Sequence, residues 1–268
     1  MKIRIRFEKT GAVRFVGHLD FMRTMQKSIR RSGLPAVYTN GFSPHMLMGF
    51  AVPLGVGEET TGDYMDLDVA LKDPVPPDEK ESCRLSDLGL DNEALPECPS
   101  SGQLIVSLNK VMPEGVRVTD IVRIGLIKSS KAMALVRSAS YDIYPGEAFS
   151  VGNDPRLVFG QMVQSPVIHA LKETKKGTKE EDIRPLIRSL SYEDVTELPE
   201  FLADGRAGGP CIHLTCDTGS VSNLKPAVLL GAAARMGGSE NVPWDFRLVR
   251  RELYDEEGRT LLELGSSF

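Results

Sequence analysis

The 268-residue sequence lacks the features that mark secreted and membrane proteins. No apolar run reaches the length of about 20 residues that a transmembrane helix needs. The first residues, MKIRIRFEKTG, lack the apolar core of a signal peptide. The cysteines are too few and too irregularly spaced for a disulfide framework; they are Cys83, Cys98, Cys211 and Cys216. We therefore expect a cytoplasmic protein with reduced thiols and no contact with a membrane.

The sequence also lacks a recognisable catalytic motif. It has no serine in a G-x-S-x-G turn and no glycine-rich loop for a phosphate or a dinucleotide. The segment CIHLTC would place Cys211 and His213 on one face of a strand and Cys216 on the other. Only Cys83 and Cys98 remain to complete a zinc site. The sequence therefore predicts no metal and no cofactor, and favours a protein that is not an enzyme.

Charge is unevenly distributed along the chain, although the formal net charge is only −5. Residues 1–50 carry nine Lys and Arg against two acids, whereas residues 51–100 carry thirteen acids against three Lys and Arg. A polyanion could bind one basic face of such a protein. The alternative is that the two segments balance each other across an ordinary solvated surface.

Hydrophobic periodicity predicts an α+β protein. Residues 1–72 are expected to form a β-β-α-β-β half. KIRIRF predicts a half-exposed strand, because its apolar and basic residues alternate, and VRFVG predicts a short return strand. HLDFMRTMQKSIRRSG predicts a helix with Asp20 as its N-cap, and MGFAVPLGVG and DYMDLDVAL predict two further strands. Residues 73–102 are acidic and rich in proline, which is typical of a linker or an insertion. Residues 103–268 predict a second α+β half, with strands in VRVTDIVRI and PCIHLTCD and two strands joined by a turn in DFRLVRRELYDEEGRTLLEL. The expected architecture is two sheet-and-helix halves, such as ferredoxin-like ones, with largely antiparallel sheets.

A lysine-rich loop in the second half, LKETKKGTKEEDIR, is a candidate for contact with a phosphate backbone. Lys175, Lys176 and Lys179 lie around the turn at Gly177, and Arg184 lies beyond it. The acids that follow at once favour the alternative of a solvated turn.

Two further groups could carry chemistry. Asp66 and Asp68 would share one face of a strand, as an acid/base or metal-binding pair requires, but any solvent-facing strand shows the same pattern. His18 would lie at the start of a helix, where an anion can bind to free backbone N–H groups. An N-cap at Asp20 would repel such an anion, so packing of the His18 ring at the start of the helix is the favoured interpretation.

The stretch YTNGFSPHMLMGF, residues 38–50, predicts a constrained corner between a helix and a strand. Its turn-forming residues are Asn40, Gly41, Ser43 and Pro44. Phe42 and His45 are not needed for such a turn, so a contact site on a preorganised backbone is one interpretation. The other is that both rings pack under the edge of the sheet.

Several motifs follow one another in the first part of the chain: F-x-K-x-G at 7–11, F-x-x-H-L-D at 15–20, R-R-x-G-L-P at 30–35, G-F-x-P-H at 41–45 and P-L-G-V at 53–56. Together they resemble the N-terminal part of a bacterial family of unknown function, the radical-SAM-linked proteins. Looser similarity in LNKVMPEGVRV and KKGTKEEDIRPLI extends the resemblance over most of the chain. Gly17, Ser43 and Met46 depart from the usual Ser, Asn and Pro, which argues against a polar role at positions 17 and 43.

The resemblance implies a partner. Members of that family are fused to, or encoded beside, a radical SAM protein, often near ribosome and ribonuclease genes. This chain lacks the C-x3-C-x2-C motif of the radical enzyme, so it resembles the detached partner. LNKVMPEGVRV followed by SYDIY is also faintly similar to tRNA pseudouridine synthases, which implies a related, pseudouridine-synthase-like architecture without their activity.

The resulting hypothesis is an accessory or substrate-presenting module for a radical SAM enzyme that acts on RNA or on the translation apparatus. The candidate binding residues are Arg14, His18, Asn40, Gly41, Phe42, Pro44, His45, Lys175, Lys176, Lys179 and Arg184. Two alternatives stay open. One is a protein-interaction module whose ligand is the radical SAM polypeptide, and the other is a stand-alone RNA-modifying enzyme that uses His18, His45 and the Asp66/Asp68 pair.

Overall fold

The computed structural model describes residues 1–71, 99–125, 131–174, 177–202 and 208–268. Its elements are β1 (Lys2–Lys9), η1 (Gly11–Phe15), α1 (His18–Arg31), β2 (Met48–Phe50), β3 (Glu59–Asp68), α2 (Ser101–Asn109), β4 (Val116–Ile124), α3 (Ala132–Leu135), β5 (Ser138–Pro145), α4 (Pro155–Gln164), β6 (His169–Thr174), β7 (Gly177–Asp182), η5 (Arg184–Leu186), β8 (Ile187–Val195), η6 (Glu200–Leu202), β9 (Gly209–Asp217), α5 (Pro226–Met236) and β10 (Phe246–Tyr254). No helix in the described parts of the chain is long and apolar enough to cross a bilayer. Most of the expected linker, residues 73–98, lies outside the described residues.

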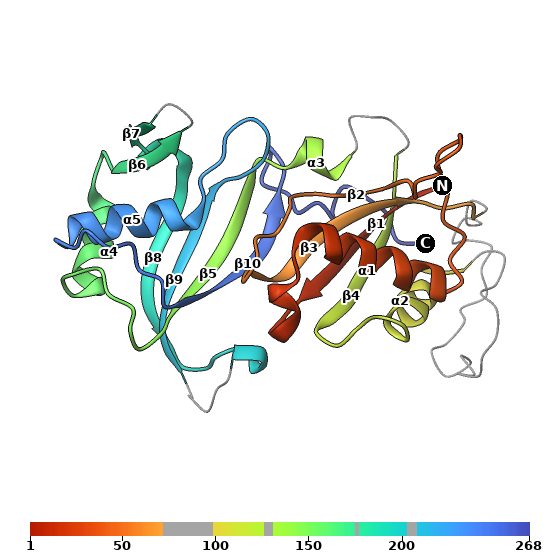
Figure 1. Ribbon diagram of the computed structural model, residues 1–268, viewed down its shortest axis with the longest axis horizontal. Helices are drawn as coiled ribbons and strands as arrows, with labels where there is room; N and C mark the ends of the chain where they lie inside the picture. Colours follow the sequence, from red (N-terminus) through yellow and green to blue (C-terminus); the bar gives the residue numbers. More distant parts are fainter. Residues whose placement is uncertain (72–98, 126–130, 175–176, 203–207) are drawn as a thin grey trace.

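One mixed sheet runs through the molecule (Figure 1). Its strands lie in the order β4-β1-β3-β10-β5-β9-β8, with β2 paired to β3 outside this path, and β6 and β7 form a separate hairpin. The neighbours β3 and β10 are parallel, and the other pairs are antiparallel. The fold is therefore α+β with a mostly antiparallel sheet, as predicted. The strands of the two expected halves join in this one sheet, and a closer likeness to ferredoxin-like or pseudouridine-synthase-like halves stays a prediction.

The two groups of strands meet at β3 and β10 through only two residue pairs. The Thr60 hydroxyl adds a bond there, because it donates to the Arg250 carbonyl oxygen at 2.9 Å. Gly62 permits the close approach, since a Cβ at this position would stand 2.1 Å from the Arg251 carbonyl oxygen. A parallel contact this short leaves no periodic pattern in the sequence, which is why the joining of the strands into one sheet was not predicted.

Helices cover the sheet in two places and enclose two apolar cores (Figure 1). α1 and α2 pack over β1, β3 and β4, with Phe7, Met25 and Leu104 buried between them. α4 and α5 lie at the other end of the molecule, where Phe159 and Leu229 are in the core. α2 and β4 follow the expected linker in sequence and nevertheless share the core of the N-terminal elements. The proposed division of the chain into domains stays a prediction.

Residues 13–17 differ from the expected β-β-α-β-β order, because VRFVG belongs largely to the 3-10 turn η1 and not to a strand. Gly11 has a φ of +70°, and its N–H donates to Glu59 Oε1 at 2.7 Å. The turn brings the carbonyl oxygens of Arg14 and Val16 to within 3.4 and 2.9 Å of the ammonium of the buried Lys9. A straight strand would leave this buried cation without acceptors, which is costly.

The polar side of β1 is covered, although the sequence predicted a half-exposed strand. Arg4 is fully buried and donates to both carboxylate oxygens of Asp66, at 2.8 and 3.2 Å. It also donates to the Leu261 carbonyl oxygen at 3.0 Å, so the C-terminal segment lies against this face. A strand whose basic face is exposed to water and one whose basic face is covered by buried acceptors show the same alternation of basic and apolar residues. The prediction of exposure was wrong for this reason.

Candidate functional site

The loop from Tyr38 to Met46, called the corner loop below, forms a closed tip at the right-hand end of the molecule in Figure 1. An isolated bridge pairs its two end residues. The Thr39 N–H donates to the His45 carbonyl oxygen at 2.8 Å, and the Thr39 hydroxyl oxygen accepts the His45 N–H at 2.9 Å. Gly41 has a φ of +121°, a conformation that favours glycine. The backbone of the corner loop is therefore preorganised.

Phe42 stands at this tip and is fully exposed, with a relative accessibility of 110%. Asn40, Pro44 and His45 are exposed as well. The interpretation that Phe42 and His45 pack under the edge of the sheet is therefore wrong. An exposed phenylalanine gains none of the roughly 1.5–3 kcal/mol that burial of such a side chain provides. Its ring is available to a ligand or a partner.

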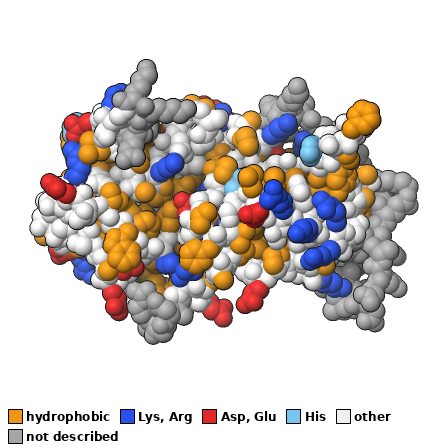
Figure 2. Space-filling model, viewed as in Figure 1, with side chains coloured by type: hydrophobic (Ala, Val, Ile, Leu, Met, Phe, Trp, Pro, Cys, Tyr) orange, Lys and Arg blue, Asp and Glu red, His pale blue; other side chains and the backbone are white. Residues whose placement is uncertain are grey.

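α1 presents a row of basic side chains to solvent. Arg23, Lys27 and Arg31 are exposed and follow one another at intervals of four residues, with Arg30 beside them. Each interval advances the helix by about 6 Å. Figure 2 shows Lys and Arg side chains gathered over α1. These four residues are called the basic ridge below.

Only one member of the basic ridge has a carboxylate partner among the described residues. Arg23 Nη1 lies 2.8 Å from Asp20 Oδ1, and both side chains are 68% exposed. Such a pair contributes at most about 1 kcal/mol. Asp20 is not the N-cap that was expected; the N-cap is Gly17, and the Asp20 carboxylate turns outward to Arg23. The rest of the ridge carries positive charge that no described acid balances.

Apolar side chains are exposed at the start of α1. Phe15, Leu19 and Val56 are 61%, 62% and 67% accessible. The Arg14 guanidinium lies 4.4 Å from the centroid of the Phe15 ring, as in a cation–π pair. Sequence reasoning named Arg14 and missed its three apolar neighbours. The exposure of Leu19 could have been predicted, because Leu19 lies four residues before Arg23 on the exposed side of α1 and not on the buried side.

His18 begins α1 and faces the protein interior. Its ring packs edge-on against Phe50 with centroids 5.3 Å apart, which agrees with packing at the start of the helix. It also lines a small cavity together with Lys9 and Asp63. Burial lowers the pKa of Lys9, and the Asp63 carboxylate partly offsets this effect. His18 therefore lies beside the exposed surface of α1 and not on it.

The lysine-rich loop belongs to the β6–β7 hairpin, at the opposite end of the molecule from the corner loop (Figure 1). Lys175 and Lys176 lie outside the described residues, and Lys179 is exposed. The Arg184 guanidinium donates to two backbone carbonyl oxygens, at 3.2 and 3.1 Å. Arg184 thus stabilises the backbone near its own position. The structure does not place the lysine-rich loop beside the basic ridge.

Asp66 and Asp68 share one face of β3, and each meets a cation directly across on β1. Asp68 Oδ1 lies 3.3 Å from Lys2 Nζ. Asp66 is bound by Arg4 and also accepts the Ala132 N–H at 2.8 Å. Asp66 and Asp68 are therefore engaged in ion pairs that stabilise the fold. The described contacts join neither one to His18 or His45, and so give no geometry for an acid/base pair.

These observations define a class: an α+β protein with a mostly antiparallel sheet, an exposed basic helix and a protruding aromatic loop. Residues 2–84 and 90–226 match the model of a family described as "uncharacterized protein conserved in bacteria (DUF2344)". The match covers most of the chain, and the protein belongs to this family. No curated protein matches the chain.

Proposed function

We propose that the protein binds RNA through the basic ridge and the corner loop, and that it serves as a non-catalytic accessory or substrate-presenting module for a radical SAM enzyme. One observation carries the RNA part. Three of the four ridge cations have no acidic partner among the described residues, in a protein whose formal net charge is −5.

The spacing of the ridge favours a ligand with repeated negative charge. Like charges four residues apart destabilise a helix by about 0.2–0.5 kcal/mol per pair. Arg23, Lys27 and Arg31 form two such pairs in succession. A phosphate backbone along the helix removes this repulsion, and the release of its counterions drives association.

Exposed aromatic rings on the same part of the molecule as the ridge favour unpaired bases over a duplex. Phe15 precedes the start of α1, and the corner loop, which carries Phe42, lies at the same end of the molecule as the C-terminal end of α1 (Figure 1). Stacking of a base on an aromatic ring contributes about 1–3 kcal/mol. Protein recognition of RNA sequence mostly uses single-stranded loops and bulges, where bases are free to stack.

The accessory role rests on the resemblance to radical-SAM-linked proteins, together with the absence of the C-x3-C-x2-C motif from this chain. The lysine-rich hairpin has no part in the proposed interface, because it lies at the opposite end of the molecule. A cytoplasmic location is part of the same proposal, since RNA and radical SAM partners are found there.

The test is fluorescence anisotropy of a labelled RNA hairpin with a single-stranded loop, titrated with the full chain at two salt concentrations. We expect binding that weakens with salt. Lys27→Gln/Arg31→Gln removes two ridge charges with little change in helix propensity. Its affinity should fall, and the slope of log K against log salt should become shallower by roughly 1.4, as expected for two lost single-strand phosphate contacts.

Lys179→Gln/Lys225→Gln is the matched control, because it removes the same charge from two exposed lysines outside the ridge. It should bind as the parent does. Absence of binding, binding without a salt slope, or an equal loss in the control would each refute the RNA proposal.

The full exposure of Phe42 also fits a protein-interaction module whose ligand is the radical SAM polypeptide. In that case the two proteins should co-purify after nuclease treatment and at high salt, and Phe42→Ala should abolish the complex. Loss of the complex on nuclease treatment alone would instead favour RNA as the bridge.

A further inference from the structure

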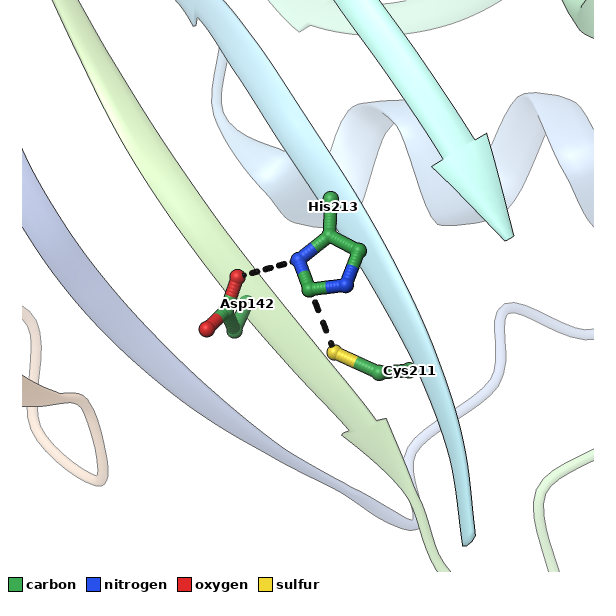
Figure 3. Close-up of side chains that lie close together, drawn as sticks. All are labelled: Asp142, Cys211 and His213. Atoms are coloured by element: carbon green, nitrogen blue, oxygen red, sulfur yellow. Dashed lines mark hydrogen bonds and ion pairs between the residues drawn. The ribbon is translucent and has the colours of Figure 1, made fainter. Parts of the chain in front are cut away.

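A second cluster of reactive side chains lies on β5 and β9, which are separated by β10 from the strands that α1 covers. Figure 3 shows its three members. β9 supplies Cys211 and His213, and β5 supplies Asp142, which is directly opposite His213 in the strand register. One sulfur, one ring nitrogen and one carboxylate oxygen from these residues all lie within 4.8 Å of one another. The three side chains converge on one face of two adjacent strands.

The ring of His213 faces an acceptor at each nitrogen. Nδ1 lies 2.6 Å from Asp142 Oδ1 and 3.9 Å from Cys211 Sγ, and Nε2 lies 3.0 Å from Glu193 Oε1. A neutral imidazole has a single N–H to donate, so it satisfies only one of these carboxylates. A cation bound at Nδ1 satisfies both sides, because the Nε2–H then remains for Glu193.

The surroundings have the form of a supporting shell. Glu193 lies opposite Cys211 on β8, where it orients the ring as carboxylates beside metal-bound histidines do. Asp142 Oδ2 accepts the Tyr144 hydroxyl at 3.2 Å and lies 3.4 Å from Arg251 Nε, which leaves Oδ1 aimed at the ring. Tyr144 and Arg251 thus hold Oδ2 of Asp142 in place.

Cys211 is the buried end of the cluster, and the His213 ring is its solvent-exposed end. Cys211 is fully buried and packs in a small apolar group with Tyr144, Leu202 and Val249. The His213 side chain is 35% exposed, so an ion can reach the ligand atoms from solvent. Burial raises the pKa of the Cys211 thiol to about 12, which keeps the sulfur protonated in the absence of an ion.

We propose that Asp142, Cys211 and His213 bind one divalent transition-metal ion of the zinc type. A thiolate, an imidazole and a carboxylate are the ligands that zinc uses, and three protein ligands leave a fourth tetrahedral position for water. On binding, the thiol S–H bond is replaced by a sulfur–metal bond and its proton passes to solvent. The neutral imidazole carries its one proton on Nε2, toward Glu193, and binds the ion through the lone pair of Nδ1.

The geometry requires a small adjustment. Metal–ligand bonds of about 2.0–2.3 Å place tetrahedral ligand atoms roughly 3.3–3.7 Å apart. The observed Sγ–Nδ1 separation of 3.9 Å is close to this range, and the hydrogen-bonded Nδ1–Oδ1 pair at 2.6 Å must open. Rotation of the Asp142 carboxylate supplies that opening. The sequence predicted no metal because only Cys83 and Cys98 offered further thiol ligands, whereas Asp142 comes to lie opposite His213 only when β5 pairs with β9.

The test is a cobalt titration of the full chain carrying Cys83→Ser and Cys98→Ser, after dialysis against a chelator. One equivalent of Co²⁺ should produce a thiolate-to-cobalt charge-transfer band, and Zn²⁺ should displace the cobalt, because zinc binds such sites more tightly. Cys211→Ser should abolish the band. His213→Asn should do so as well, and it serves as the second variant because the ring is partly exposed. Glu193→Gln should weaken binding about 10–100-fold.

Cys216→Ser is the matched control. Cys216 is on the same strand, equally buried and on the opposite face, and a serine can keep its bond to the Leu224 carbonyl oxygen. The band should persist in this variant. Absence of the band in the parent, its persistence in His213→Asn, or its loss in Cys216→Ser with the fold retained by circular dichroism would overturn the proposal.

Discussion

Replacement of Asp63 by Asn should destabilise the protein by about 3–5 kcal/mol, the usual cost of breaking a buried ion pair. The Arg250 guanidinium donates to Asp63 at the junction of β3 and β10, and both side chains are 2% exposed. Asparagine has nearly the same shape and can still accept the Tyr64 N–H, which lies 2.8 Å from Asp63 Oδ1. The substitution therefore removes one charge and little else.

The magnitude follows from what remains after the substitution. Among the described residues, Arg250 would keep its charge with only the Val52 carbonyl oxygen as an acceptor, at 3.0 Å, because its Nε has no hydrogen-bond partner there. The buried ammonium of Lys9 would lose the carboxylate that offsets its burial. Two buried cations would thus be less compensated. The loss is a large fraction of the roughly 5–15 kcal/mol that stabilises a typical domain.

Urea unfolding at neutral pH, followed by circular dichroism, measures this difference. Arg156→Gln is the control, because the Arg156–Asp194 pair is more than half exposed on both sides and should cost at most about 1 kcal/mol. Adding Arg250→Met to Asp63→Asn removes the unpaired buried charge and should recover part of the loss. The reasoning fails if Asp63→Asn costs no more than the control, or if Arg250→Met lowers stability further.

Two other predictions concern titratable groups. In the Cys83→Ser/Cys98→Ser background, Cys211 and Cys216 should resist a thiol reagent at mildly alkaline pH until urea is added, because burial raises the pKa of both thiols to about 12; reaction of the native chain at the unfolded rate would contradict this. Burial opposes ionisation of Asp255, but hydrogen bonds from the Arg259 side chain and from backbone N–H groups hold its pKa below the usual 3.8. This stabilisation is complete above pH 3.8 and is lost as the pH falls through the lower folded value, so urea unfolding over that acid range should show a shallower pH dependence in Asp255→Asn than in the parent.

Elements with a strong local pattern were predictable. Phe21, Met25 and Ile29 recur on one face of α1 and are buried there. The alternation in VRVTDIVRI corresponds to β4 over its whole length, and PCIHLTCD corresponds to β9. In each case one face of the element packs on a core. The residues of that element alone are enough to show which face is apolar.

Elements whose conformation depends on distant partners were not predictable. η1 exists because a buried lysine needs carbonyl oxygens, and neither the burial nor the need is visible in VRFVG. The last segment, DFRLVRRELYDEEGRTLLEL, was expected to form two strands and has one, β10, followed by turns. The turn at Asp255 is closed by its own hydrogen bonds to residues 257 and 259, which leave no second strand to pair.

The candidate sites also differ in whether they could be predicted from the sequence. The corner loop could be found from sequence because all of its turn residues lie within positions 40–44. The Asp142, Cys211 and His213 cluster could not be found in this way, because β5 ends at Pro145, β9 begins only at Gly209, and no local pattern indicates that the two strands are neighbours. CIHLTC supplied only two of the three ligands.

The buried pair of Arg4 and Asp66 shows what joins such separated segments. Arg4 lies on β1 and Asp66 on β3; the Asp66 carboxylate also accepts the N–H of Ala132 at the start of α3, and Arg4 donates to the carbonyl oxygen of Leu261 after β10. Four segments distant in sequence therefore meet at one ion pair. Two apolar side chains of the same volume could provide comparable stability. They could not provide directional bonds to a particular N–H and a particular carbonyl oxygen, and those bonds fix where α3 and the C-terminal segment lie against the sheet.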